Sequence, residues 1–509
     1  MKLKNILLCA SVLGGLALSS CTGNFLDEDR NPNSLDPENF WKSESDILKG
    51  LTAAYAGLQP TIEWAQPFER YIVIDNYRSD ELDYRPDVTA WMELAMYNNE
   101  STNYVPNDEW TNLYTSINYC NQCLDNIPNV PDNDDEGIKQ TKATSIAEAR
   151  FLRAFYYYRL FINFGERLPM FEHELEGTEE EFYPPQVEAG RLKTFIETEL
   201  SECQANLPEK WNTNMAGRVT KYTAAALLGK YYMFIGEKAK AKTEFWKVID
   251  SHRYELMENY GDNFNGLHEN NKESILEVQF TGSLEGGHYE YNLFTLHLGP
   301  DSGAYEEAYP SKWLFNTLKK DLTEDGEYSD RLYETIIFDD PKSRPFYYED
   351  GKGFSDYHQE DNIYWRKYVT YDKSLGDYWD YSGFNIPLIR YADILLLYAE
   401  CLNDEGNSKE AIKYINKVRD RVHVTPLSDT LSKEQVLKHL QDVERPCELA
   451  LEGSRWYDLI RWGIVEDALK SHEKPFASNF ISTKHIRLAI PHKEFLMNPN
   501  WVQNEGYTK

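Results

Sequence analysis

The chain has 509 residues, of which 41% are hydrophobic, and it carries 53 Lys and Arg against 84 Asp and Glu, a net charge of −31. This apolar content is enough for a large core, which excludes intrinsic disorder and small disulfide-dependent folds. The negative charge repels phosphate backbones and anionic lipid headgroups, and the sequence has no basic patch to offset it, so we expect no nucleic-acid partner.

Residues 1–20 are predicted to be an export signal. Two lysines precede an apolar stretch from Ile6 to Leu18, which is too short to cross a bilayer because spanning takes about 20 apolar residues. The following Leu18-Ser19-Ser20-Cys21 resembles a bacterial lipobox. This resemblance implies a lipoprotein signal peptide, with Cys21 acylated as the mature N-terminus. The alternative is an ordinary signal peptide cleaved nearby, with Cys21 as a plain thiol.

The next segment is predicted to be a flexible tether. Residues 21–38 are rich in Asn, Asp, Glu and Pro and poor in apolar side chains, so they cannot bury a core. We therefore expect a single folded domain over residues 39–509, held to a membrane by lipid.

A Cys-x-x-Cys pair lies within an amphipathic helical pattern. Cys120 and Cys123 have the spacing of half a zinc site, but no second pair and no nearby His pair accompanies them. Two interpretations remain, cysteines buried on a helix face and metal or redox chemistry. The sequence favours the first, and we expect no metal site.

Helical periodicity dominates much of the chain. Between residues 143 and 164 the apolar positions recur every three or four residues, and Gly165 supplies a stop. Two later segments, 228–248 and 396–418, share one pattern in which a Gly ends a helix and an Ala opens the next. Small residues let two antiparallel helices approach closely. These segments resemble tetratricopeptide helical hairpins.

The region between the two hairpins differs in composition from the helical segments. It is rich in Gly, Asp and aromatic residues, contains a strand-like run from Ser274 to Phe280, and includes long irregular pieces. We therefore expect a mainly α-helical fold with an inserted loop-rich lobe that contains short strands. The predicted boundaries are scaffold helices at about 40–255 and 386–470, a variable ligand lobe at about 256–385, and an extended C-terminal tail at about 471–509.

Three common catalytic and phosphate-binding motifs are absent from the sequence. There is no Gly-x-Ser-x-Gly, no His-Glu-x-x-His and no Gly-x-x-x-x-Gly-Lys. Asp132-x-Asp134-x-Glu136-Gly137 imitates the start of a calcium loop, but Ala143 stands where the bidentate Glu belongs. A solvated acidic turn is the favoured interpretation, so Ca²⁺ is not supported by a complete motif and no cofactor is expected. A pair of carboxylates for glycoside hydrolysis is not excluded, because its separation is a three-dimensional quantity.

Several segments in a fixed order resemble the SusD/RagB family of outer-membrane nutrient-binding lipoproteins. The resemblance extends over nearly the whole chain, and its strength lies in the order of the segments. They are Cys21 with Phe25-Leu26-Asp27, the run from Ala147 to Tyr156, Asn271 to Phe280, Arg390 to Glu400, Ile415 to Arg419, Glu448 to Gly463, Ile490-Pro491, and Asn498 to Tyr507.

This resemblance implies a fold, a location and a function. The expected fold is a scaffold of tetratricopeptide-like hairpins, and the expected location is the cell surface, lipid-anchored in the outer membrane. The protein would act as a lid on a TonB-dependent SusC-like transporter barrel, capturing an oligosaccharide and delivering it unchanged, so it is expected not to be an enzyme. Two alternatives remain: a peptide-binding or structural lid with a non-sugar ligand, and an anchored hydrolase with an unrecognised acid pair.

The charged residues of the family segments are predicted to be structural. They lie inside otherwise apolar helices, where a charge needs a partner, so we expect ion pairs between helices. The alternative is that they contact ligand. These residues are Arg150, Arg153, Arg390, Asp393, Glu400, Arg455, Asp458 and Arg461.

The ligand-binding candidates combine aromatic rings with polar side chains outside the scaffold segments. An aromatic ring stacks on the apolar face of a sugar, while polar side chains bond its hydroxyl groups. Trp91 is the first choice, because similar proteins commonly place a stacking aromatic there; the alternative for each ring is packing in the core. The candidates are Arg78, Asp80, Trp91, Tyr97, Asn98, Tyr289, Tyr291, Tyr305 and Trp379.

Overall fold

The computed structural model describes residues 40–60, 66–175, 183–285, 288–300, 304–345, 348–369 and 382–509. The predicted signal peptide (1–20), the tether (21–38) and the lipidation site Cys21 lie outside these ranges, as does Trp379.

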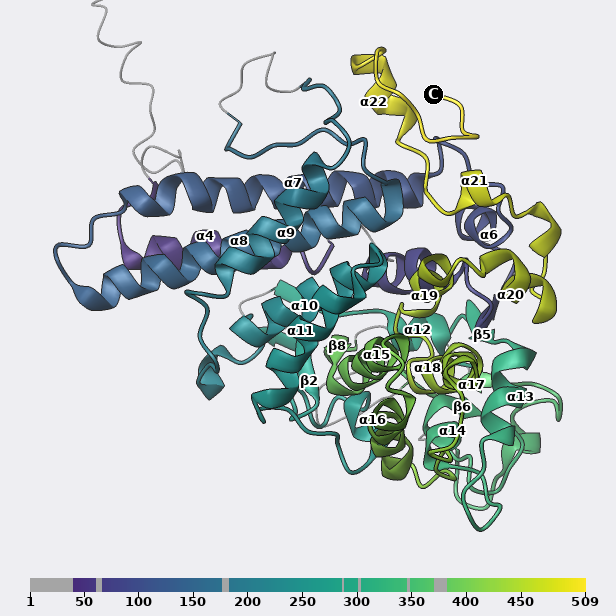
Figure 1. Cartoon of the computed structure of the whole chain (residues 1–509). Helices are drawn as coiled ribbons and strands as arrows, with labels where there is room; N and C mark the ends of the chain where they lie inside the picture. The colour runs from purple at the N-terminus through teal and green to yellow at the C-terminus, as the bar shows by residue number, and fades with distance from the viewer. Residues whose placement is uncertain are drawn as a thin grey trace, which may run out of the picture.

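The N-terminal part is a layer of long helices. The helix α8 (Glu136–Phe164) packs against α7 (Tyr104–Asn126) and α9 (Arg191–Cys203), and α4 (Glu44–Ala56) contacts both α7 and α8 (Figure 1). The Asp135 carboxylate accepts hydrogen bonds from the first N–H groups of α8, which explains the acidic turn before it. The helix ends at Gly165, whose φ of +92° suits a residue without Cβ, so the predicted periodicity and stop are confirmed.

The two predicted hairpins form and stack on each other. The first consists of α10 (Lys221–Phe234) and α11 (Lys238–Asp250), and the second of α15 (Tyr391–Asp404) and α16 (Ser408–Arg421). Helix α11 packs against α15, so hairpins that are far apart in the sequence lie side by side (Figure 1). The mainly helical, tetratricopeptide-like fold is therefore confirmed.

The lobe between the hairpins contains short antiparallel strand pairs. The predicted strand is β2 (Ser274–Val278), which pairs with β8 (Ile386–Arg390) so that Leu276 lies opposite Ile389. This pairing brings the start and the end of the lobe together. The other pairs are β1 (Leu82–Tyr84) with β5 (Ala308–Pro310), β3 (Thr281–Glu285) with β4 (His288–Glu290), and β6 (Ile336–Ile337) with β7 (Tyr364–Trp365).

Short helices complete the lobe and the C-terminal part. Residues 386–390, predicted as the start of the second scaffold part, form strand β8 rather than helix, and the predicted extended tail contains helices α21 and α22. The remaining helices are α5 (Gln66–Phe68), α6 (Thr89–Ala95), α12 (Phe294–Leu298), α13 (Lys312–Lys320), α14 (Asp330–Thr335), α17 (Lys433–His439), α18 (Arg445–Glu448), α19 (Arg455–Trp462), α20 (Val465–Ser471), α21 (Ser482–His485) and α22 (His492–Met497), with π-helical turns η1 (Glu69–Ile74) and η7 (Leu440–Glu444).

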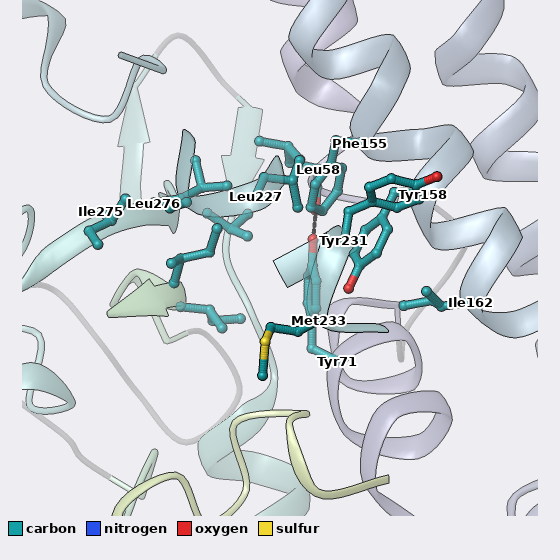
Figure 2. Packing of buried hydrophobic residues seen from close by; sticks show 14 of the residues in the cluster. Leu58, Tyr71, Phe155, Tyr158, Ile162, Leu227, Tyr231, Met233, Ile275 and Leu276 are labelled. Carbon is teal, nitrogen blue, oxygen red and sulfur yellow. Dashed lines mark hydrogen bonds between the residues drawn. The ribbon is translucent and has the colours of Figure 1, made fainter. Parts of the chain in front are cut away.

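One continuous core joins the helical layer, the hairpins and the lobe. Figure 2 shows the part where Phe155 of α8 and Leu227 of α10 lie near Leu58 and Tyr71. The Tyr71 hydroxyl donates to the Leu58 carbonyl at 2.7 Å, which satisfies the polar end of a buried ring. The cysteines of α7, Cys120 and Cys123, are buried and unbridged, which confirms the helix-face interpretation.

The predicted ion pairs are present between helices. Arg153 of α8 pairs with Glu199 of α9 at 2.7 Å, and Arg461 of α19 pairs with Glu400 of α15 at 2.6 Å. Arg390 contacts the carboxylates of Glu273, Glu448 and Glu452, in a network that also includes Arg331, Lys367, Arg421 and Glu444. The charged family residues therefore hold the scaffold together.

Candidate functional site

Four of the predicted ligand residues, Arg78, Asp80, Trp91 and Tyr97, are buried in this structure, so their side chains offer no open surface to a ligand. Trp91 is 2% exposed, and its Nε1 donates to Glu69 at 2.8 Å because α6 turns the indole toward the core. Asp80 is 1% exposed, with its carboxylate paired to Arg455 at 2.7 Å. The Tyr97 hydroxyl donates to the Arg78 carbonyl at 2.8 Å, and both side chains are buried.

The other candidates divide by exposure. Tyr305 is 41% exposed, Asn98 is exposed, and Tyr291 is half-buried. Tyr289 lies in β4, but its side chain lies outside the described part of the structure, and so does the whole of Trp379. Tyr305 is therefore the aromatic candidate from the sequence that offers an open ring.

A buried cluster of rings supports Tyr305. The His297 ring of α12 stacks on Phe68 with centroids 4.5 Å apart, and it meets Trp91 edge-on at 5.4 Å. Tyr305 then contacts His297 at 5.7 Å. Burial lowers the pKa of His297 to about 3, so this ring is neutral and packs as an aromatic surface. Trp91 thus has a supporting role beneath the exposed tyrosine.

A second exposed tyrosine lies at the other end of the same cluster. Tyr104, the first residue of α7, is 43% exposed, and its hydroxyl donates to Glu69 Oε1 at 2.7 Å. The same Glu69 oxygen accepts the Trp91 hydrogen bond. Burial raises the pKa of Glu69, while these two hydrogen bonds favour the carboxylate. Sequence reasoning missed Tyr104, because its helical position gave no sign that the ring is exposed.

Charged side chains lie beside Tyr305. The Arg85 guanidinium donates to the Tyr305 carbonyl and pairs with Asp87 at 2.8 Å, and the Arg85 and Asp87 side chains are 48% and 39% exposed. Burial, reinforced by the neighbouring Asp87 carboxylate, raises the pKa of Glu307 to about 8. We call Tyr104, Tyr305, Glu69, Arg85 and Asp87 the Tyr305 face.

The Tyr305 face combines the groups that a carbohydrate needs. Two exposed rings offer flat apolar surfaces for stacking on sugar C–H groups. Arg85 supplies hydrogen-bond donors, and Asp87 supplies acceptors, for sugar hydroxyl groups. These side chains are held from below by packed rings and hydrogen bonds, so little side-chain freedom is lost when a ligand binds.

A separate groove of about 540 Å³ lies between the α9–α10 connection and β2. Its walls include Trp211, whose face carries the Arg218 guanidinium at 4.0 Å, together with Tyr254 and Asn270. The sequence gave no signal for this groove, because its walls come from segments that are far apart in the chain. It is a second concave surface with aromatic and amide side chains.

Two general properties concern metals and membranes. Within the described ranges, no three His, Cys, Asp or Glu side chains are grouped closely enough to bind a metal ion. In the same residues, no helix has the length and apolar content needed to traverse a bilayer.

Comparisons with known proteins give one consistent family. A model described as "SusD family" matches residues 272–507, and one described as "Starch-binding associating with outer membrane" matches residues 24–233. A SusD-like protein of Formosa agariphila is 26% identical, with 100% of both chains covered.

Solved structures agree in fold. A SusD superfamily protein from Bacteroides vulgatus has a TM-score of 0.79 at 24% identity, covering 92% of this chain and 100% of that one. A structure described as a laminarin-binding SusD-like protein has a TM-score of 0.73 at 26% identity, with the same coverage of 92% and 100%.

Proposed function

Because the chain belongs to the SusD family, whose two models together match residues 24–233 and 272–507, we propose that it is a glycan-binding lipoprotein of the cell surface. It captures an oligosaccharide by aromatic stacking and hydrogen bonding, breaks no bond, and passes the ligand to a TonB-dependent transporter in the outer membrane. Cys21 carries the lipid that anchors it.

The observation that carries this proposal is the pair of exposed rings on the Tyr305 face. Tyr305 and Tyr104 are 41% and 43% exposed, whereas most large rings among the described residues are buried or half-buried. An open ring costs free energy in water unless a partner covers it. Beside them, Arg85 and Asp87 provide partly exposed hydrogen-bonding groups for hydroxyls.

The capture step is binding without chemistry. The ligand stacks on the two rings while charged side chains bond its hydroxyl groups, and affinity comes from flat contact and a few hydrogen bonds. We expect a Kd between about 1 μM and 1 mM, because a carrier must release its ligand to the transporter. The relatives' descriptions make laminarin and starch oligosaccharides the first ligands to test.

Titration calorimetry with three ligand sets tests the proposal. Laminarin oligosaccharides, starch oligosaccharides and a peptide library are titrated into the protein, and chromatography then checks the oligosaccharides for shortening. Saturable heat with a glycan of unchanged length supports the proposal. Binding to peptides alone would make the protein a lid with a non-sugar ligand, and shortened products would make it a hydrolase.

A further inference from the structure

Arg78 differs from the other buried arginines in the part of the chain that the structure describes. It is 1% exposed, yet no carboxylate of the described residues lies within 4.0 Å of its guanidinium. Every other buried arginine has such a partner, for example Arg445 with Asp458 at 2.7 Å and Arg70 with Glu109 at 2.6 Å. The others are Arg153, Arg159, Arg331, Arg390, Arg419, Arg421 and Arg455.

Most donors of the Arg78 side chain are unused. Nη2 donates to the Ile74 carbonyl at 3.1 Å and to Asn163 Oδ1 at 2.9 Å. Nε and Nη1 are buried and have no hydrogen-bond partner. The guanidinium lies 4.7 Å from the Trp456 ring centroid, so a cation–π contact covers one side without using an N–H group.

The surroundings add positive charge and further donors. Arg487 makes no ion pair among the described residues; burial lowers its pKa, and the nearby Arg78 charge acts in the same direction. Burial lowers the pKa of His485 to about 4, so that ring is neutral. The buried Trp456 Nε1 and His485 Nε2 atoms also have no hydrogen-bond partner.

The nearby carboxylates are already paired with other groups. Asp75 accepts from Arg159 Nη1 and from the Tyr457 hydroxyl, each at 2.7 Å. Glu100 is bonded to Lys484 at 2.7 Å. The hydroxyls of Tyr97 and Tyr507 donate to backbone carbonyls. Within the described ranges, no carboxylate therefore neutralises Arg78 directly.

A guanidinium remains charged even when it is buried, and an unpaired buried charge destabilises the folded state. This destabilisation is removed by a ligand that is negative and accepts hydrogen bonds. We propose that Arg78 binds a small monovalent anion, a halide or a formate-sized carboxylate, between η1, α19 and the C-terminal segment 485–507. A small size follows from the enclosure, since Arg78, Trp456 and His485 are each at most 4% exposed.

The bound anion would fasten the C-terminal segment to the helical layer. Arg78 follows η1, Trp456 lies on α19, and His485, Arg487 and Tyr507 belong to the C-terminal segment. An anion among these groups stabilises the folded state, because a ligand that binds only the folded state raises its stability.

Thermal unfolding at fixed ionic strength tests the site. Melting temperatures are measured for the full chain in sodium chloride, sodium formate and sodium gluconate, whose anion is too large for the enclosed position. We expect Tm to rise by about 2–5 °C in chloride or formate relative to gluconate. A response to chloride alone would identify a halide site, and a response to formate alone a carboxylate site.

Two variants connect the response to Arg78. Arg78→Met keeps an unbranched, mostly apolar side chain without the charge and the N–H donors, and it should lose the difference between salts. Arg366→Met, at a partly exposed arginine that pairs with Glu334 at 3.1 Å, should keep it. Equal Tm values for the unaltered protein in all three salts, or a full response in Arg78→Met, would overturn the proposal.

A crystal soaked in bromide provides a test that does not depend on how the variants fold. An anomalous peak about 3.3 Å from Arg78 Nε or Nη1 is expected if a halide binds. For a carboxylate site, a formate soak should give two oxygen positions at hydrogen-bonding distance. Neither feature beside Arg78 in well-ordered crystals would contradict the proposal.

Discussion

At the residue scale, the charges of the family segments are a structural feature. Arg390 is 1% exposed, and its Nε lies 2.7 Å from Glu452, with Glu273 and Glu448 also in contact. These carboxylates come from the turn before β2, from α18 and from the turn after α18, so one guanidinium joins segments that are separated in the sequence. Removing one partner of such a buried ion pair destabilises the folded state, because the other charge is left buried and unpaired.

We expect Arg390→Ala to lower the free energy of unfolding by about 3–5 kcal/mol, because it leaves buried carboxylates unpaired. Glycan affinity should stay within twofold, since the ion-pair partners of Arg390 are Glu273, Glu448 and Glu452, none of which belongs to the Tyr305 face. Urea unfolding and calorimetry measure the two effects. Arg253→Ala, at an exposed ion pair with Glu209, should change stability by less than about 1 kcal/mol. Lost affinity with unchanged stability in Arg390→Ala would assign Arg390 to the ligand.

A single buried carboxyl group, Glu81, makes the free energy of unfolding depend on pH. Its side chain is fully buried, and burial, with the charge of Asp80 added, raises its pKa to about 8 from an ordinary value of 4.5. Between pH 4.5 and 8 the folded state therefore holds a proton that the unfolded state releases. The contribution of Glu81 to stability is complete below this range and declines as the pH rises through it.

We expect Glu81→Gln to remove this dependence, because the amide imitates the protonated carboxyl group. The free energy of unfolding of the unaltered protein should decline relative to the variant by up to about 1.4 kcal/mol per pH unit between pH 5 and 8. Urea unfolding at four pH values measures the difference. Parallel pH profiles for the two proteins would show that Glu81 is ionised in the folded state.

The burial of individual side chains could not be predicted from the sequence. Arg78, Asp80, Trp91 and Tyr97 have the side chains of a sugar site, but contacts with distant segments bury them. Asp80 pairs with Arg455 across 375 residues of chain. A local pattern of aromatic and polar residues cannot reveal such a partner, because burial is decided by tertiary packing.

At the element scale, the helices could be predicted because local features of the sequence determine them. Apolar periodicity and a terminal glycine fix α8 locally. The hairpins could be predicted from Gly and Ala spacing, since close helix approach needs small residues at fixed positions. The Tyr305 face could not be predicted, because its residues come from η1, α7 and the loops after β1 and before β5. The rings that support it, from α6 and α12, meet it only in three dimensions.

The contact between α10 and α11 tests the hairpin packing. A Cβ built on Gly229 would lie 2.4 Å from Phe245 Cε1. We expect Gly229→Ala to destabilise the protein by about 1–3 kcal/mol through overpacking, reduced by the roughly 1 kcal/mol that alanine contributes to helix propensity.

The matched control is Gly353→Ala, because nothing lies within 4 Å of a Cβ at that position. Its Tm should match that of the unaltered protein, while Gly229→Ala should melt several degrees lower. A Gly229→Ala protein at least as stable as the parent would mean that the two helices are less tightly packed than described.

At the scale of the whole molecule, segments that are far apart in the sequence pack against each other. Helix α11 packs on α15 across the inserted lobe, and β2 pairs with β8 at its base. The repeat architecture could be read from the sequence, but the direct stacking of distant hairpins could not, because no local pattern specifies which element follows in space. These two contacts fix the position of the lobe, which carries Tyr305, relative to the helical scaffold.

Membrane attachment is the prediction at this scale. With a net charge of −31, the protein is repelled by anionic headgroups, so attachment should depend on lipid at Cys21. We expect Cys21→Ser to move the protein from the membrane fraction to the soluble fraction and to abolish labelling by radioactive palmitate. Cys203→Ser, at a buried thiol within α9, should remain attached and labelled. A Cys21→Ser protein that stays with the membrane would contradict lipid anchoring.

Glycan capture by an exposed tyrosine on a packed ring cluster can be measured by calorimetry of three proteins with the glycan that binds. Tyr305→Ala should weaken binding at least tenfold, which corresponds to about 1.4 kcal/mol of lost stacking and contact. Tyr119→Ala, at a tyrosine of α7 that is 38% exposed outside this cluster, should bind as the unaltered protein does. Equal affinity in Tyr305→Ala and the unaltered protein would contradict the account.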